Sequence, residues 1–182
     1  MIDCAYLKEV MSSQELDYSE DLADWLDLYA RLLVEWNEKI NLTAITDPAG
    51  IVLKHFMDSL LLTKAVEIPQ NASLIDIGTG AGFPSVPVRL YRPDIRLVLL
   101  DSLNKRINFL STLTQELGIQ AECRHGRAEE VGREPEYREQ FDFATARAVT
   151  NLRDLSEYCL PYVKVGGCFA ALKGYDVEEE WK

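Results

Sequence analysis

The chain has 182 residues, 47% of them hydrophobic, which is enough for one domain of ordinary size with a well-formed core. Its formal net charge of −11 argues against non-specific binding to nucleic acid. The four cysteines are scattered, so we expect a reducing, cytoplasmic setting without disulfides or a metal site. No signal-peptide core begins the chain, and no apolar run approaches the length of a membrane span.

The first 70 residues predict two helices. The first spans residues 19–36, with Ser19 as N-cap and an apolar face at steps of three and four formed by Leu22, Trp25, Leu26, Tyr29, Leu32, Leu33 and Trp36. A polar break is expected at 37–43. Asp47 and Pro48 then suit the N-cap and first position of a second helix over 49–66, whose inward residues are Ile51, Val52, Phe56, Ser59, Leu60 and Leu62.

From residue 74 the pattern alternates between strands and helices. Strands are expected at 74–77, 96–100, 121–124, 141–146 and 168–172, with helices at 84–90, 104–117 and 152–162, a charged connection at 130–139 and a turn at 165–167. This alternation predicts a doubly wound, Rossmann-like α/β sheet in the order 3-2-1-4-5, with the ligand where the order reverses. We therefore expect a helical extension over 1–70 packed on a domain over 71–182.

A glycine loop follows the first strand, in the run D-I-G-T-G-A-G-F-P at 76–84. Glycines at alternate positions let the backbone turn sharply and approach a ligand. A dinucleotide fingerprint would need its third glycine at position 83, where the chain has Phe83, so nicotinamide cofactors are disfavoured. The spacing, with Asp76 ahead of Gly78, Gly80 and Gly82, resembles the S-adenosylmethionine loop of class I methyltransferases. Asp101 ends the second strand, where an acidic side chain accepts ribose hydroxyls.

A longer series of motifs is similar to the glucose-inhibited division protein B family, RsmG. These motifs are W-N-E-K-I-N-L-T (36–43), K-H-F-x-D-S-L (54–60), the glycine loop, R-A-E (127–129), A-R-A-V (146–149) and L-K-G (172–174). The resemblance implies a bacterial methyltransferase acting on a guanine N7 of small-subunit (16S) ribosomal RNA. It implies S-adenosyl-L-methionine contacts at Gly78, Phe83, Asp101, Ser102, Leu103, Ala128, Glu129 and Arg147.

Two departures from that family pattern bear on the expected fold. Ser85 stands where the family usually has glycine, so the helix start is expected to be less closely packed. Family members also continue through another helix and a C-terminal antiparallel strand pair, which we expect to be missing here. The last strand would then be an exposed apolar edge.

The implied chemistry is an in-line displacement at a methyl group, in which orientation supplies much of the rate. Guanine N7 carries a lone pair and no proton, so no general base is expected. Arg147 is the predicted catalytic residue, orienting the methionyl carboxylate or guanine O6; the alternative is a surface ion pair. Glu129 has the alternative of a simple solvent-facing charge. His55 and His125 are interpreted as structural histidines. For His55 and Asp58, the sequence nearby offers too few further ligands for a metal site.

For RNA, we expect a basic surface beside the site. Lys105 and Arg106 begin the helix after the second strand, and the predicted RNA-binding set comprises Asn37, Lys39, Lys105, Arg106, Arg124 and Lys173, with a rim extended by Arg127, Arg133, Arg138 and Arg153. Residues 1–70 carry 13 acidic and 5 basic side chains, against 17 and 14 in 71–182. The acidic extension should repel random RNA, so a structured ribonucleoprotein is the expected substrate. For Asn37 and Lys39, helix capping is the alternative.

The leading prediction is thus a cytoplasmic, monomeric enzyme that methylates 16S ribosomal RNA, either free or in the small ribosomal subunit, and that has neither a membrane nor a metal partner. Two alternatives stay open. One is a class I methyltransferase for a small molecule, with the N-terminal helices as a lid. The other is a non-catalytic nucleoside-binding factor in ribosome assembly.

Overall fold

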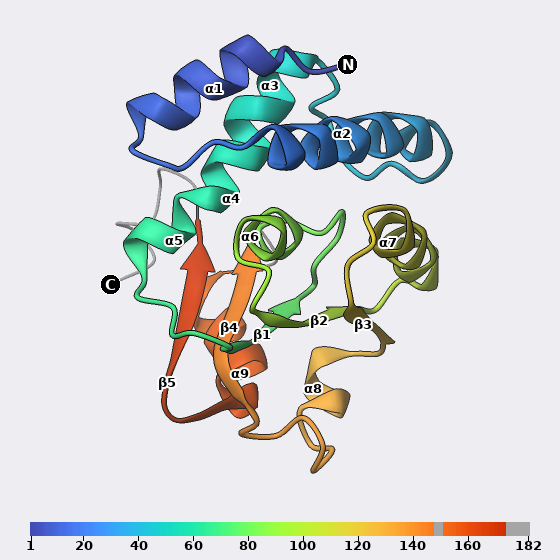
Figure 1. Cartoon of the computed structure of the whole chain (residues 1–182). Helices are drawn as coiled ribbons and strands as arrows, with labels where there is room; N and C mark the ends of the chain where they lie inside the picture. Colours follow the sequence, from blue (N-terminus) through green and yellow to red (C-terminus); the bar gives the residue numbers. More distant parts are fainter. Residues whose placement is uncertain (148–150, 174–182) are drawn as a thin grey trace.

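The computed structural model describes residues 1–147 and 151–173, and its centre is a parallel sheet (Figure 1). The strands are β1 (Ser73–Ile77), β2 (Arg96–Asp101), β3 (Ala121–His125), β4 (Phe141–Arg147) and β5 (Val163–Leu172). They pair in the order β3-β2-β1-β4-β5, with every pair parallel. The predicted strand order is therefore confirmed, and the order reverses between β1 and β4.

Helices cover both faces of this sheet, as Figure 1 shows. On one face lie α6 (Ser85–Tyr91) and α7 (Asn104–Glu116); on the other lie α8 (Ala128–Val131), α9 (Leu152–Cys159) and the 3-10 turn Leu160–Tyr162. Alternate residues of one strand serve the two cores: Leu97 and Leu99 join the first, while Val98 and Leu100 join the second. Two buried faces explain why β1 and β2 are largely apolar, whereas β3 at the edge of the sheet is half-buried or exposed.

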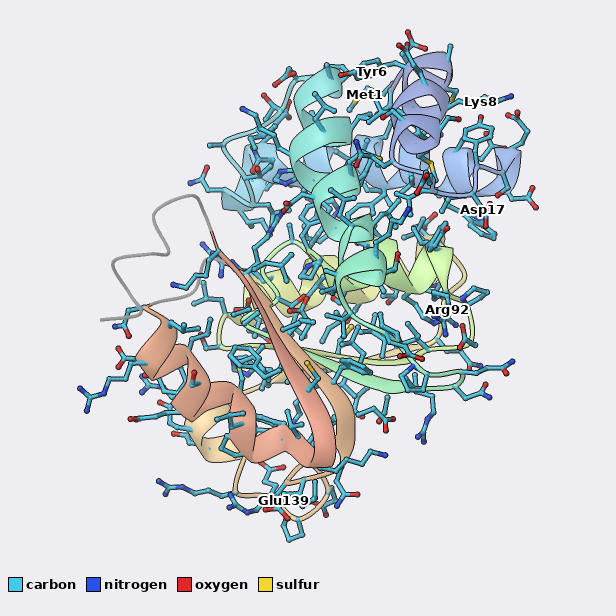
Figure 2. The ribbon with its side chains drawn as sticks, turned by 90° about the vertical axis from the view of Figure 1, so that its left-hand side faces the viewer. Met1, Tyr6, Lys8, Asp17, Arg92 and Glu139 are labelled. Atoms are coloured by element: carbon cyan, nitrogen blue, oxygen red, sulfur yellow. The ribbon has the colours of Figure 1, made fainter. Side chains whose placement is uncertain are left out.

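The N-terminal helices form a further layer above α6 and α7 (Figure 1). They are α1 (Cys4–Ser13), α2 (Glu20–Ile40), α3 (Pro48–Ile51), a π-helical turn (Val52–Met57) and α4 (Asp58–Leu60). The next helix, α5 (Leu62–Ala65), lies at the level of α6 in Figure 1. One hydrophobic cluster runs from Leu7 and Leu26 through Phe56 to Leu97 on the sheet. At the edge of this junction the Asp17 amide donates to the Tyr91 hydroxyl at 3.1 Å. Figure 2 shows Asp17 and Arg92 on this same side, with Met1 and Glu139 at opposite ends of the molecule.

The predicted helix ends are mostly confirmed. Ser19 accepts a hydrogen bond from the Leu22 amide, Asp47 accepts one from Gly50, and Gly118 lies just beyond α7 at φ +64°. The six residues predicted to face inward on the second helix are all buried. The helix α1 lacked a prediction; Asp3 caps it by accepting from the amides of Ala5 and Tyr6.

Three local predictions are wrong. The polar break at 37–43 begins too early, because α2 continues to Ile40 and ends at Asn41 in the left-handed region, φ +48°. Trp25 was expected in the core, but it is 40% exposed. Residues 165–167 belong to β5 and not to a turn, since β5 begins at Val163 and its register against β4 shifts between Phe141 and Phe143.

Strand β5 is the edge of the sheet next to β4, and its residues are half-buried or exposed. None of the described helices is long and apolar enough to span a membrane. The prediction about the C-terminal strand pair concerns a part of the fold outside the described residues. The motifs at 146–149 and 172–174 also end outside them.

Candidate nucleoside and substrate site

The glycine loop after β1 is pressed against the N-terminal layer. Gly78, Gly80 and Gly82 have φ angles of +64°, +61° and +95°, a region that side chains other than glycine rarely adopt. A Cβ on Gly82 would lie 2.7 Å from the Tyr29 hydroxyl, so this position also lacks room. Tyr29 donates a hydrogen bond of 2.5 Å to the Ala81 carbonyl. The loop is thus held in one shape by its backbone and by α2.

Asp76, in β1, holds this loop in place through hydrogen bonds. Its carboxylate is fully buried and accepts hydrogen bonds from the hydroxyls of Ser85 at 2.5 Å, Thr79 at 2.8 Å and Thr145 at 3.3 Å. Burial raises the pKa of Asp76 to about 7, although the three hydroxyls act in the opposite direction. Ser85 is fully buried and joins the start of α6 to the strand end, so the looser packing expected at this position is not observed.

A cavity of about 370 Å³ lies at the carboxyl ends of β1 and β2 and beside the loop after β3. It is lined by Ile77, Gly78, Leu100, Asp101, Ser102, Leu103, Gly126, Arg127, Ala128, Glu129 and Tyr158. Six predicted cofactor residues, Gly78, Asp101, Ser102, Leu103, Ala128 and Glu129, are therefore brought together around one cavity. The other five, Asp76, Gly80, Gly82, Phe83 and Arg147, lie outside that lining.

Asp101 is the polar centre of the cavity wall. Its two carboxylate oxygens accept hydrogen bonds of 2.9 Å from the amides of Gly80 and Leu103, and Arg106 Nη1 lies 3.5 Å from Oδ2. A carboxylate has about four acceptor positions, so capacity remains for hydroxyl donors of a ligand. The side chain of Leu103 is 41% exposed beside it. The cavity lining therefore combines a fixed carboxylate acceptor with apolar side chains such as Ile77 and Leu100.

Arg147 ends β4, on the other side of the loop. Asp76 pairs with Thr145 in the β1–β4 register, so continuing that register sets Gly78 beside Arg147. The guanidinium donates to the Lys54 carbonyl at 3.2 Å, lies 3.4 Å from the Asp58 carboxylate and 3.2 Å from His55 Nδ1, and sits 4.9 Å from the centre of the Phe83 ring. Its side chain is 21% exposed. Arg147 is thus held at the switch point, and it forms an ion pair with the carboxylate of Asp58, whose side chain is 52% exposed.

The predicted RNA-binding residues do not form one free basic surface. Lys105 is exposed at the start of α7, whereas Arg106 is half-buried beside Asp101. Arg124 Nη2 contacts both Glu134 oxygens, at 2.7 and 3.0 Å, so it belongs to an ion pair. Lys39 lies 3.2 Å from Glu35 on α2. Lys173 is half-buried at the end of the described chain.

Asn37, in the last turn of α2, binds the backbone of the loop that follows this helix. Its Oδ1 accepts hydrogen bonds from the amides of Leu42 at 2.5 Å and Thr43 at 2.8 Å. His125 is exposed on β3 and lies 3.0 Å from the Ser102 carbonyl, beside the cavity and outside its lining.

Sequence reasoning missed several residues of the site. Tyr158 of α9 lines the cavity although it lies 80 residues beyond Gly78 in the chain. Tyr29 packs against Phe83 with ring centres 5.1 Å apart, and it was predicted only as a core residue. Helical spacing identified the buried face of α2 but carries no information on which loop that face meets.

Comparisons with known proteins point to one family. A family model described as rRNA small subunit methyltransferase G matches residues 23–182. A protein from Desulforamulus reducens named Ribosomal RNA small subunit methyltransferase G is 49% identical over 177 residues, covering 97% of this chain and 74% of the relative. A Clostridium perfringens protein of the same name is 50% identical over 175 residues, covering 96% and 73%.

Solved structures are similar in fold. A SAM-dependent methyltransferase from Aquifex aeolicus aligns with a TM-score of 0.53 at 19% identity, covering 73% of this chain and 75% of its own. A Corynebacterium glutamicum protein aligns with a TM-score of 0.58 at 18% identity, covering 97% and 83%. The sheet and its covering helices therefore share the fold of these two structures.

Proposed function

The chain belongs to the rRNA small subunit methyltransferase G family, and on this premise we propose that it uses S-adenosylmethionine to methylate N7 of a guanosine in 16S ribosomal RNA. The observation that carries the proposal is the family match over residues 23–182. The matched residues include those that line the cavity beside Asp101. The relatives' shared name gives no support to a small-molecule substrate or to a non-catalytic assembly factor.

The geometry of this cavity supports the proposed cofactor contacts. Asp101 accepts the ribose hydroxyls, with its orientation fixed by the amides of Gly80 and Leu103. Leu103 and Tyr158 border the cavity and supply apolar surface for an adenine ring. Asp76 acts indirectly, because its contacts with Thr79 and Ser85 shape the loop that carries Gly78.

Bound S-adenosylmethionine supplies an electrophilic methyl group on a sulfonium sulfur. The N7 lone pair attacks without losing a proton, so the protein's task is to align the base with that methyl group. Arg147 lies at the switch point with its guanidinium held by the Lys54 carbonyl and the Asp58 carboxylate. In this proposal it orients guanine O6 or the methionyl carboxylate through charge-assisted hydrogen bonds.

The charge distribution bears on the form of the substrate. Residues 1–70 carry 13 acidic and 5 basic side chains, and this extension forms the layer above α6 and α7. Such a surface repels loose RNA phosphates over roughly a Debye length, about 8 Å at physiological salt. We propose that a monomer acts in the cytoplasm on the small ribosomal subunit, where folded RNA and protein present the guanosine by shape.

Methyl-label transfer tests the substrate class. The enzyme is incubated with labelled S-adenosylmethionine and, in parallel, with unmodified small subunits, naked 16S RNA, large subunits and a metabolite extract. The proposal expects label in 16S RNA, with small subunits the preferred acceptor. Label confined to the metabolite extract would establish a small-molecule enzyme. Tight cofactor binding without transfer to any of the four acceptors would favour the non-catalytic factor.

A further inference from the structure

Three segments far apart in the sequence meet at the Arg147 guanidinium, counting the end of β4 that carries it. Lys54, His55 and Asp58 come from the π-helical turn and the start of α4, and Phe83 follows the glycine loop. A π-helical turn widens the backbone and is frequent at functional sites. Here it presents a carbonyl, an imidazole ring and a carboxylate to one side chain. The direction of Arg147 is therefore determined outside its own strand.

The protonation of His55 follows from its two neighbours. A guanidinium has only donors, so its contact of 3.2 Å with His55 Nδ1 requires that this nitrogen be unprotonated and accept. The ring proton then resides on Nε2, which lies 2.8 Å from Thr43 Oγ1. His55 is a neutral ring of one defined tautomer, 5% exposed, whose orientation is fixed at both nitrogens. Consistently, burial and the adjacent Arg147 charge lower the pKa of His55 to about 4.

Thr43 is itself held in place. Its hydroxyl oxygen accepts from the Ile45 amide at 3.0 Å, and its backbone amide donates to Asn37 Oδ1 at 2.8 Å. A hydroxyl oxygen can accept two hydrogen bonds, so Thr43 accepts from Ile45 and from His55 Nε2–H together. A continuous chain of hydrogen bonds thus runs from the end of α2 through Thr43 and His55 to Arg147.

We propose that His55, held as the Nε2–H tautomer by Thr43, is a positioning residue that aims the Arg147 guanidinium at the methyl-transfer site. The inference rests on the proposed function of Arg147 and deepens it. His55 does not touch the substrate and transfers no proton. It supplies the acceptor for Arg147 Nη2, whereas the Lys54 carbonyl and the Asp58 carboxylate both contact Nη1, at 3.2 and 3.4 Å.

The competing role for His55 is packing. Its ring stacks on Phe83 with centres 4.4 Å apart, so any substitution removes an aromatic contact. Two amide variants separate packing from positioning because both lose the ring. In H55N the amide oxygen occupies the place of Nδ1 and accepts from Arg147. In H55Q the amide reaches the place of Nε2, contacts Thr43 and leaves Arg147 without its acceptor.

Single-turnover methylation of small subunits at saturating S-adenosylmethionine compares these variants, with R147A as reference. We expect H55Q to lose about tenfold or more in rate and H55N to recover to within about threefold of wild type, with equal cofactor affinity by calorimetry. Equal losses in both variants would overturn positioning and leave packing. If R147A itself were unchanged, the proposed role of Arg147 would fail instead.

The tautomer gives a readout independent of activity. The chain has two histidines, so long-range ¹H–¹⁵N spectra show two rings, and H125Q assigns them. At neutral pH we expect His55 to show a protonated Nε2 and an unprotonated Nδ1, with R147A shifting Nδ1 and T43V shifting Nε2. A protonated Nδ1, or a Nδ1 signal unchanged in R147A, would overturn the inference even in a preparation without substrate.

Discussion

The Asp101 carboxylate has a structural role in the fold, beside the ligand-binding role that we propose for it. It closes the glycine loop through the Gly80 amide and the start of α7 through the Leu103 amide. Removing it therefore changes the cavity as well as the ligand contact. The matched change Asp101→Asn keeps the shape and an acceptor but loses the charge.

The affinity for S-adenosylmethionine should fall in the order wild type, D101N, D101A. Hydrogen bonds to a charged acceptor contribute about 1.5–3 kcal/mol each, so D101A should lose at least about tenfold and D101N less. Isothermal calorimetry measures both variants, and thermal unfolding without ligand checks that each is folded. An unchanged affinity in D101A would remove Asp101 from the ribose site.

Two buried groups should respond to pH with opposite sign. The pKa of Asp76 is raised to about 7, so between its ordinary value near 3.8 and 7 the folded state holds a proton that the unfolded state has released, and stability falls as pH rises. The pKa of His55 is lowered to about 4, so between 4 and 6.5 the unfolded state holds the extra proton, and stability rises with pH.

Urea unfolding at pH 5 and pH 6.5 tests this opposition. Each group contributes at most about 2 kcal/mol over this interval, at 1.36 kcal/mol per pH unit. We compare the change in the free energy of unfolding from pH 5 to 6.5. This change should be more negative in H55N than in wild type, and more positive in D76N than in wild type. Variants that shift the slope in the same direction would contradict the buried, neutral states assigned to these groups.

At the scale of elements, the sequence determines most of the fold. The strands β1 and β2 were predictable because both of their faces are buried, which produces largely apolar runs. The π-helical turn was not predictable, because it is a local widening of the helix that does not change the spacing of hydrophobic residues enough to be recognised. The ion pair between Arg124 and Glu134 was not predicted either. The sequence does not show that the loop after β3 folds back and brings Glu134 to the arginine.

The glycine loop is the element whose shape is most constrained. Gly82→Ala should be strongly destabilising, because it adds left-handed strain of about 1–2 kcal/mol to overpacking of about 1–3 kcal/mol against Tyr29 and Val86. Gly118→Ala is the matched control: its φ is +64°, but no atom lies within 4 Å of the added Cβ. Denaturant unfolding should show G82A losing more stability than G118A. Equal losses would mean that the loop is not tightly packed against α2.

The start of α7 carries two bases with different surroundings. Lys105 is exposed, while Arg106 lies beside Asp101, so K105E should lower RNA methylation and leave cofactor affinity nearly intact, and R106E should weaken both. Losing one phosphate contact should also make the salt dependence of RNA binding shallower by about one unit. Filter binding across a salt series measures the slope. Full methylation and an unchanged slope in K105E would locate RNA contacts elsewhere.

At the scale of the whole molecule, an acidic helical layer sits on a domain whose acidic and basic residues are nearly balanced. The residue types of the cofactor cavity were predictable because they follow strand ends, which the fold gathers at one edge. The series of hydrogen bonds from Asn37 to Arg147 was not predictable. It depends on the folded extension bringing the Thr43 hydroxyl to a ring nitrogen of His55.

The position of the transferred methyl group tests the central claim most directly. Small subunits lacking the modification are methylated by the enzyme, and the 16S RNA is treated with borohydride and aniline, which cleave the chain at N7-methylguanosine. The account predicts one new, S-adenosylmethionine-dependent cleavage at a guanosine, reduced in rate by about 10²-fold in R147A. Methyl label in the RNA without any cleavage, or label recovered on a base other than guanine, would contradict it.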